Sequence, residues 1–289
     1  MQWRGRRGSR NIEDRRGQRS VGRAGRAGGV GGLGLVAVLI IGYFLGIDVT
    51  PLLQGGGPLG GQIDSGAQVE ITEADREAGQ FVSVVLADTE EVWTEIFREN
   101  LGETYQPATL VLYKGVTSSP CGGASGASGP FYCPADKKAY LDTDFFVTMQ
   151  NRLGAGGDFA AAYVVAHEIA HHVQNELGIL PQVNRMRQQV SQAESNALSV
   201  RVELQADCLS GVWARYAQAR FNSLEQGDLQ EAINAARQIG DDTLQRNAGK
   251  RPNPHTFTHG TSEQRQRWFA KGYQEPRIQT CDTFSAAQL

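Results

Sequence analysis

The chain has 289 residues, which is enough for one or two domains. Its hydrophobic fraction of 40% and its charged fraction of 20% are typical of a globular protein rather than a disordered one. The formal net charge of -3 hides an asymmetry. Residues 1–26, the head, carry nine arginines against Glu13 and Asp14 and so hold a charge of +7, which leaves -10 on the rest of the chain. A basic head on an acidic body indicates an anionic partner for the head, either nucleic acid or a membrane.

An uncharged stretch, AGGVGGLGLVAVLIIGYFLGI, follows the head at residues 27–47. Its apolar part is short, but with the preceding glycines it reaches the roughly 20 residues that a helix needs to cross a membrane. A cleaved signal peptide is the main alternative, but the following GIDVTPLLQ offers no small-x-small cleavage site. A buried core helix is the weaker alternative, because flanking glycines and nine arginines make poor core neighbours. We therefore expect an uncleaved transmembrane helix.

The arginines predict the orientation of this helix. Because Lys and Arg are retained on the cytoplasmic side, we expect residues 1–26 in the cytoplasm and the chain after about residue 48 in the periplasm or outside the cell. Anionic membrane lipid, rather than nucleic acid, is then the expected partner of the arginines. Residues 48–71 are rich in glycine and proline, and we expect them to form a flexible linker.

The remaining residues, 72–289, are expected to form one domain. Apolar residues at helical or alternating spacing, with glycine, proline and capping residues at the boundaries, predict its elements. Helices are expected at residues 71–102, 142–154, 157–178, 183–219, 228–246 and 261–273, and strands at 108–115 and 137–142, the second short and a candidate edge strand. The fold class that results is α+β, mainly helical, with a small sheet.

The four cysteines fit an extracytoplasmic domain. An even number of cysteines outside the cytoplasm indicates two disulfide bonds. Cys121 and Cys133 bracket a glycine- and serine-rich loop and are the favoured pair. Cys208 and Cys281 would then tie the end of the chain to an interior helix. Four free thiols are the alternative.

The stretch VVAHEIAHHVQNE at residues 164–176 contains a candidate metal site. His167 and His171 are four residues apart, so on a helix both side chains project from one face and can bind one ion. Glu168 lies about 100° round the helix, where it can take a proton from a water molecule at the metal. This H-E-x-x-H pattern is the arrangement of two ligands and a base in zinc metalloproteases. A helix with surface histidines is the alternative, but the apolar neighbours predict a buried helix, in which unpartnered polar groups are costly.

A catalytic zinc site usually has three protein ligands and one open position. The metzincin extension of the motif is absent, since Gln174 and Leu177 stand where it needs glycine and histidine. The stretch VELQADCLSG at residues 202–211 offers another source, because Glu203 and Asp207 are four apart and share a helix face. Glu203 is the candidate third ligand, and Asp207 can accept the second ring N–H of a ligand histidine. A solvated acidic face is the alternative, which the apolar or small neighbours disfavour.

The other histidines have less defined roles. His172 directly follows a ligand and is expected to point elsewhere, as a structural residue. His255 and His259 lie in the stretch NPHTFTHGTSEQRQRWF. His259 and Arg265 are candidates for stabilising the oxyanion that forms when water attacks a carbonyl. A loop histidine and an arginine on a helix face are the alternative.

Beyond the motif, the chain resembles a bacterial family of neutral zinc metallopeptidases that are anchored by an N-terminal membrane helix. The stretches that carry the resemblance are WRGRRGSRNIEDRRG, GPFYCPADKKAYLD, AHEIAHHVQ, ELQADCLSGVWA and THGTSEQRQRWF. The resemblance implies a gluzincin-like zincin fold, similar to the catalytic core of thermolysin. It also implies His167, His171 and Glu203 as zinc ligands, Glu168 as the general base and Asp207 as an orienting residue.

These features together predict a zinc metalloendopeptidase that acts on protein or peptide substrates. Zinc supplies the activation of water and of the scissile carbonyl, while Glu168 takes the proton of the water and passes it to the leaving amine. We expect an extended substrate to pair with a sheet edge at residues 139–141. The alternative is a non-enzymatic, membrane-tethered binding or assembly module with a structural zinc, for which His255 or His259 would supply a fourth ligand.

Overall fold

The computed structural model describes residues 1–17, 71–125 and 129–289. This part of the chain is mainly helical with a small sheet, which confirms the expected α+β class. The predicted transmembrane helix at residues 27–47 lies outside the described residues, as does almost all of the predicted linker. Within the described ranges, no helix has both the length and the apolar character that a membrane span needs.

The helices largely follow the predicted positions. They are α3 (Glu73–Ile96), α4 (Asp144–Arg152), α5 (Asp158–Glu176), α6 (Ile179–Arg187), α7 (Gln192–Phe221), α8 (Asp228–Gln238), α9 (Asp241–Asn247) and α10 (Ser262–Gln274), with a π-helix, η1 (Phe97–Leu101), and two 3₁₀ helices, η2 (Pro254–Thr256) and η3 (Ile278–Cys281). Two expected helices are interrupted. Residues 183–219 are divided between α6 and α7, because Ser191 and Glu194 form a capping box that begins a new helix. Residues 228–246 are divided between α8 and α9 at Gly240.

The strands are β1 (Ile12–Asp14), β2 (Thr109–Tyr113), β3 (Val116–Ser119), β4 (Gly122–Ser125), β5 (Phe131–Cys133) and β6 (Lys138–Asp142). One sheet has the order β1-β2-β6-β5, and β3 and β4 form a separate hairpin. β1, β2 and β6 run parallel, and β5 is antiparallel to β6. Strand β2 is buried from Leu110 to Tyr113, as expected of a strand that is covered on both faces.

The expectation that residues 137–142 form an edge strand is wrong. β6 pairs with β2 on one side and, at residues 138–140, with β5 on the other, so Ala139 and Tyr140 lie inside the sheet and offer no free backbone edge to a substrate. The edge on this side is β5, and its Tyr132 packs against His172 of α5 with ring centroids 5.5 Å apart. The glycine-rich sequence between Cys121 and Cys133 has weak strand propensity and is typical of a loop, so it does not predict β4 or β5.

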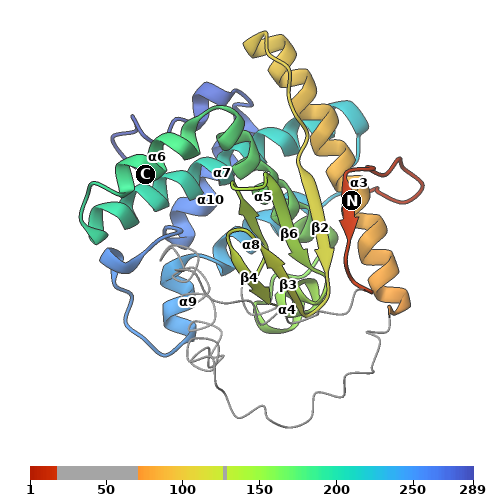
Figure 1. Ribbon diagram of the computed structural model, residues 1–289, viewed down its shortest axis with the longest axis horizontal. Helices are drawn as coiled ribbons and strands as arrows, with labels where there is room; N and C mark the ends of the chain where they lie inside the picture. Colours follow the sequence, from red (N-terminus) through yellow and green to blue (C-terminus); the bar gives the residue numbers. More distant parts are fainter. Residues whose placement is uncertain (18–70, 126–128) are drawn as a thin grey trace.

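The first residues of the head are part of the folded domain. Ile12–Asp14 forms β1, which pairs with residues 110–112 of β2, and Figure 1 shows this segment running beside α3. Trp3 is buried against Phe81 of α3, with ring centroids 5.5 Å apart. The N-terminal ammonium group lies 2.6 Å from Asp158, the first residue of α5. Residues 1–17 therefore belong to the same folded body as the rest of the described chain. The predicted domain boundary at residue 72 leaves them out.

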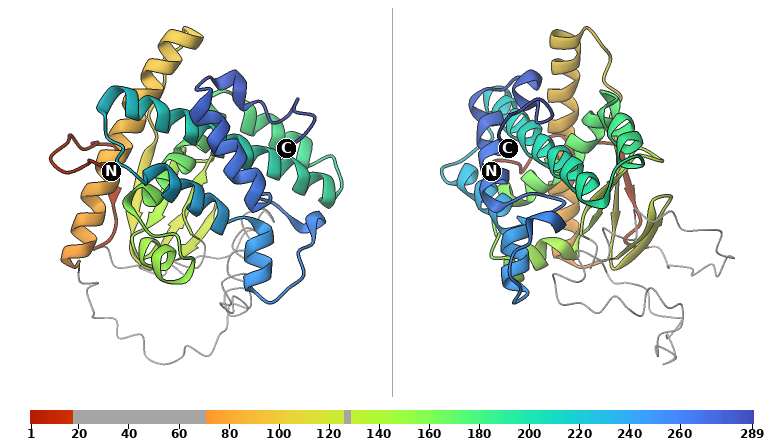
Figure 2. Two further views of the ribbon diagram at one scale, coloured as in Figure 1. Left: turned by 180° about the vertical axis from the view of Figure 1, so that it is seen from behind. Right: turned by 90° about the vertical axis from the view of Figure 1, so that its left-hand side faces the viewer.

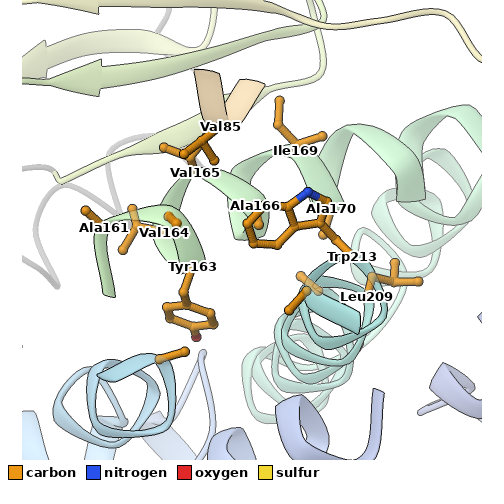
Figure 3. Close-up of a cluster of buried hydrophobic side chains, with 14 of the residues drawn as sticks. Val85, Ala161, Tyr163, Val164, Val165, Ala166, Ile169, Ala170, Leu209 and Trp213 are labelled. Carbon is orange, nitrogen blue, oxygen red and sulfur yellow. The ribbon is translucent and has the colours of Figure 1, made fainter. Parts of the chain in front are cut away.

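Helix α5 lies in the centre of the core and packs against α3, α7 and α8 (Figure 2). In Figure 3, Val85 of α3 lies over Val165, while Leu209 and Trp213 of α7 lie beside Ala170. These five side chains are buried, as are most others on this helix. The H-E-x-x-H motif is thus carried by a helix that is apolar nearly all round, which is the burial that the sequence predicts.

Helices α7 and α10 approach each other very closely. A Cβ atom at Gly211 of α7 would collide with the carbonyl oxygen of Phe269, and one at Gly272 of α10 would collide with the carbonyl oxygen of Cys208. Glycine at both crossing points lets the two backbones touch. This contact holds the face of α10 that carries Arg265 against α7.

Both expected disulfide bonds are present in the structure. Cys121 pairs with Cys133, which joins the β3–β4 hairpin to β5. Cys208 pairs with Cys281, which holds the end of the chain against α7. The two predicted pairings are confirmed.

Candidate metal centre

Helices α5 and α7 bring three metal-binding side chains together. His167 and His171 project from α5, and Glu203 projects from α7. Nε2 of His167 lies 3.1 Å from Oε2 of Glu203, and Nε2 of His171 lies 3.5 Å from Oε1. Candidate ligand atoms of all three residues lie within 4.8 Å of one another. The fold therefore brings together the three residues that the sequence predicts as ligands.

This donor set fits a zinc ion. Two imidazole nitrogens and one carboxylate oxygen, with a position left open, are typical ligands of catalytic zinc. In a tetrahedron with bonds of ~2.1 Å, ligand atoms lie about 3.4 Å apart, close to the 3.1 and 3.5 Å separations between the histidines and Glu203. Burial would lower the pKa of His167, but Asp207 and Glu203 raise it to about 10. The surroundings of this imidazole thus favour a positive charge, which a metal cation can supply in place of a proton.

Gln174 orients the ring of His171. Its side-chain oxygen lies 2.8 Å from Nδ1 of His171. Its amide nitrogen donates to the carbonyl oxygen of Val202 at 2.8 Å and to Oε1 of Gln205 at 2.9 Å. These two bonds fix which end of the amide faces the histidine, so Nδ1 of His171 carries the proton and donates it. Nε2 is then left with its lone pair free to bind the metal.

Asp207 and Arg265 form a fully buried ion pair behind His167. Nδ1 of His167 lies 2.9 Å from Oδ1 of Asp207, although without the alignment of a regular hydrogen bond. Arg265 donates from Nε to Oδ2 at 2.9 Å and from Nη2 to Oδ1 at 3.0 Å, and the hydroxyl of Tyr163 donates to Oδ1 at 2.5 Å. Burial would raise the pKa of Asp207, but Arg265 and His167 lower it. A carboxylate held as a charged acceptor in this way can fix the tautomer and orientation of a ligand histidine.

The position of Arg265 corrects its predicted role. Its side chain is 2% exposed, and its guanidinium is used by Asp207, by Tyr163 and by the carbonyl oxygen of Ile239. Arg265 is therefore not placed to stabilise an oxyanion. It is a positioning residue that holds Asp207, and the sequence did not reveal this because the two residues lie on different helices.

Glu168 lies next to the ligands on α5 and is 8% exposed. Burial raises the pKa of its carboxyl group, and the neighbouring His171 and His167 oppose this rise. The carboxylate is therefore close to the ligand histidines in a site that contains little bulk water. This is the location that a general base at a metal site requires.

His259 lies in the loop that precedes α10. Burial would raise the pKa of Glu203, but His171 and His259 lower it, so the charge of Glu203 and the ring of His259 interact electrostatically. Asp241 of α9 holds this loop. Its Oδ2 accepts the backbone N–H groups of Thr258, His259 and Gly260 at 2.8, 2.6 and 2.9 Å. Its Oδ1 lies 3.3 Å from Nδ1 of His259, which leaves Nε2 for other partners.

The other two histidines lie outside the ligand set. Nδ1 of His172 lies 3.0 Å from the hydroxyl of Tyr132, and its Nε2 lies 2.6 Å from the carbonyl oxygen of Gln106. This ring therefore links α5 to β5 and to the segment before β2, in line with its predicted structural role. His255 is exposed in η2.

Three residues of the site were not predicted from the sequence. Tyr163 lies four residues before His167, and Gln174 lies three residues after His171. Helical spacing is therefore the signal that could have placed both on the same face as the histidines. Asp241 lies in a separate short helix, and nothing in its local sequence connects it with His259.

Comparison with known proteins agrees with this geometry. A family model described as "Putative neutral zinc metallopeptidase" matches residues 1–284. The chain belongs to this family. Membership in the neutral zinc metallopeptidases implies a zinc cofactor and a peptide or protein substrate.

Relatives of this neutral zinc metallopeptidase occur in Escherichia coli and in Mycobacterium bovis. The chain is 47% identical to the uncharacterized protein YpfJ of Escherichia coli K12, over 98% of this chain and 99% of YpfJ. It is 47% identical to the uncharacterized protein Mb2605 of Mycobacterium bovis, over 64% of this chain and 65% of that protein. No solved structure matches the chain.

The buried ion pair of this metallopeptidase gives a testable prediction about stability. Arg265→Met is expected to lower the free energy of unfolding by about 3–5 kcal/mol, because it leaves Asp207 as an uncompensated buried charge. The double variant Asp207→Asn, Arg265→Met should recover part of this loss. Urea unfolding of the zinc-free protein measures both effects. Arg267→Met, on the exposed face of α10, is the matched control, and an equal loss in the control and in Arg265→Met would contradict the prediction.

Proposed function

We propose that this protein is a zinc metalloendopeptidase in which Glu168 is the general base. The observation that supports this most strongly is the convergence of His167, His171 and Glu203 beside Glu168. A structural zinc site is closed by four protein ligands and needs no base, whereas a catalytic site has three ligands and an open position. The group of His167, His171 and Glu203 offers three ligands with Glu168 beside them, which supports a site of the second kind.

Each residue then has a defined part in the reaction. A bound zinc ion supplies the Lewis-acid chemistry that activates water and polarises the scissile carbonyl. Glu168 accepts the proton of the attacking water and passes it to the leaving amine. His259 donates its Nε2–H toward the oxyanion that develops on the carbonyl oxygen. Gln174 and Asp207 keep the rings of the ligand histidines in their binding orientation.

An extended substrate is proposed to lie along β5 rather than β6. β5 is an edge strand, and it packs against the helix that carries the ligands. Its Tyr132 lies among Leu180, Val183 and Val202, which are buried side chains of α6 and α7. Backbone pairing with a sheet edge supplies affinity that does not depend on sequence, while side-chain pockets supply specificity. This arrangement suits an enzyme that cuts within a chain.

The role proposed for His259 leads to a prediction about rate. His259→Gln is expected to reduce kcat by about 100- to 1,000-fold and to change KM little. The loss of one oxyanion donor has an effect of this size on kcat in other hydrolases. Steady-state kinetics with a fluorogenic peptide measures this. His255→Gln, in the exposed part of the same loop, is the control and should keep wild-type kcat. An unchanged kcat in His259→Gln would remove this residue from the mechanism.

The proposed activity is tested with the purified full chain. Zinc is removed with a chelator and then restored, and cleavage of a mixed peptide library is followed by mass spectrometry. We expect internal peptide bonds to be cut only by the zinc-loaded protein. If the protein binds one zinc per chain tightly and cuts neither the library nor unfolded protein substrates, the alternative of a binding module with structural zinc is supported instead.

We also propose that the domain works outside the cytoplasm. Its two disulfide bonds support this, because such bonds form and persist in oxidising compartments. Thiol alkylation in intact cells, followed by a mass shift assay, should find all four cysteines protected. Four reactive thiols in the native protein would place the domain in a reducing compartment.

A further inference from the structure

Arginines of the head are bound to acidic side chains of α3. Arg6 donates to Asp88 through both terminal nitrogens, at 2.8 and 2.6 Å. Nη2 of Arg7 lies 2.8 Å from Oε1 of Glu91. Burial raises the pKa of Asp88 to about 6 against the opposing effect of Arg6, so Arg6 supplies the counter-charge that this buried carboxylate needs. The charge of these arginines is thus used within the molecule, and the expected membrane-lipid partner for them is not supported.

Two glycines show how closely the head and α3 fit together. A Cβ atom at Gly8 of the head would overlap the side chain of Ser83. A Cβ atom at Gly79 of α3 would lie 2.7 Å from Nη2 of Arg16. Glycine is unfavourable in the interior of a helix, and at Gly79 the close approach of the arginine accounts for it. Both partners therefore carry a small residue where they meet.

The described residues that flank segment 18–70 lie close together. Arg16, at the end of the described head, donates to the backbone carbonyl of Asp75 in the first turn of α3. The backbone N–H of Arg15 donates to the carbonyl oxygen of Leu112 in β2 at 2.7 Å. Arg16 and Asp75, which flank segment 18–70, are consequently held side by side on one folded surface.

We infer that the head and the metallopeptidase domain lie on the same side of any membrane that the protein meets. A single crossing between residues 17 and 71 would separate them by about 30 Å of hydrocarbon, whereas their atoms are within hydrogen-bonding distance. Residues 17 and 71, the described residues on either side of segment 18–70, then face the same compartment. The positive-inside rule counts the arginines that flank a membrane span, but here Arg6 and Arg7 are ion-paired with acidic side chains of α3. The inference does not depend on the proposed peptidase activity.

Cysteine labelling of the full chain in cells tests this inference. One variant carries Arg10→Cys in the exposed part of the head, and another carries Glu99→Cys in the exposed π-helix after α3. The four native cysteines are paired and should not react. With a membrane-impermeant maleimide, we expect both positions to label before permeabilisation, or both only after it. Labelling of one position before permeabilisation and of the other only after it would overturn the inference.

A second measurement tests the contact on which the inference depends. In the purified full chain, Arg6→Asp is expected to lower Tm by roughly 5 °C or more, because two carboxylates then face each other in a buried position. Adding Asp88→Arg should restore much of this loss, since the pair is then present with its charges exchanged. Arg10→Asp, at an exposed position of the head, is the control and should leave Tm nearly unchanged. A wild-type Tm in Arg6→Asp would show that the head does not dock, and the inference would fall with it.

Discussion

Glutamine in place of Glu168 is expected to leave zinc binding intact and to lower kcat for peptide hydrolysis by about 1,000-fold or more. The amide side chain of glutamine has nearly the same shape as the carboxylate of glutamate. Residue 168 is also not one of the three proposed zinc ligands, so its replacement should leave zinc binding unchanged. It cannot accept a proton from water, so the step that depends on the base is lost. Kinetics and metal analysis of the same protein sample measure the two properties together.

The control for this variant is Glu176→Gln on the same helix. Glu176 pairs with Lys137 at 2.8 Å, on a part of α5 beyond the ligand histidines. Loss of this ion pair should leave kcat within about twofold of wild type. The pair lies away from the proposed ligands, and a surface ion pair contributes little to the stability of the fold. Zinc-loaded Glu168→Gln that turns over substrate at the wild-type rate would rule out Glu168 as the base.

Alanine in place of Glu203 is expected to weaken zinc binding by more than about 100-fold. Loss of a group that only hydrogen-bonds to a ligand weakens metal binding by up to about 100-fold, and loss of a ligand itself should cost more. Only the two histidines of α5 would then remain from the ligand set. Hydrolysis should fall in parallel, and excess zinc should restore little of it. Competition with a chromophoric chelator measures the affinity, and circular dichroism checks that α7 is still folded.

Glu263→Ala in the exposed first turn of α10 serves as the control for the loss of one acidic side chain. It should bind zinc with wild-type affinity. If Glu203→Ala still holds one tightly bound zinc per chain, Glu203 is not the third ligand. The carboxylate of Asp207 would not replace it easily, because Arg265 and Tyr163 already occupy both of its oxygens.

The local parts of this site could be predicted from the sequence. Helical periodicity fixes which side chains share a face, so the spacing of His167 and His171 and that of Glu203 and Asp207 predicted two pairs. The apolar surroundings of each pair predicted that both would be buried. The class of fold followed from the lengths and periods of the elements, and the disulfide pairing followed from the loop that Cys121 and Cys133 enclose.

The parts that depend on distant contacts could not be predicted in this way. Arg265 looks like an ordinary helix-face arginine until the glycine contact between α7 and α10 places it against Asp207. The pairing of Asp241 with the His259 loop depends on how two short elements meet. The arginines of the head looked free because the sequence does not show that the acidic residues of α3 lie against them.

The most direct test of the central claim is a comparison of cells that produce wild type with cells that produce Glu168→Gln at equal levels. Newly formed protein N-termini are identified by mass spectrometry in both. A peptidase with Glu168 as its base predicts a set of N-termini that appears only with the wild-type protein and only when zinc is available. Identical sets of N-termini in the two strains, with zinc bound to both proteins, would contradict the account.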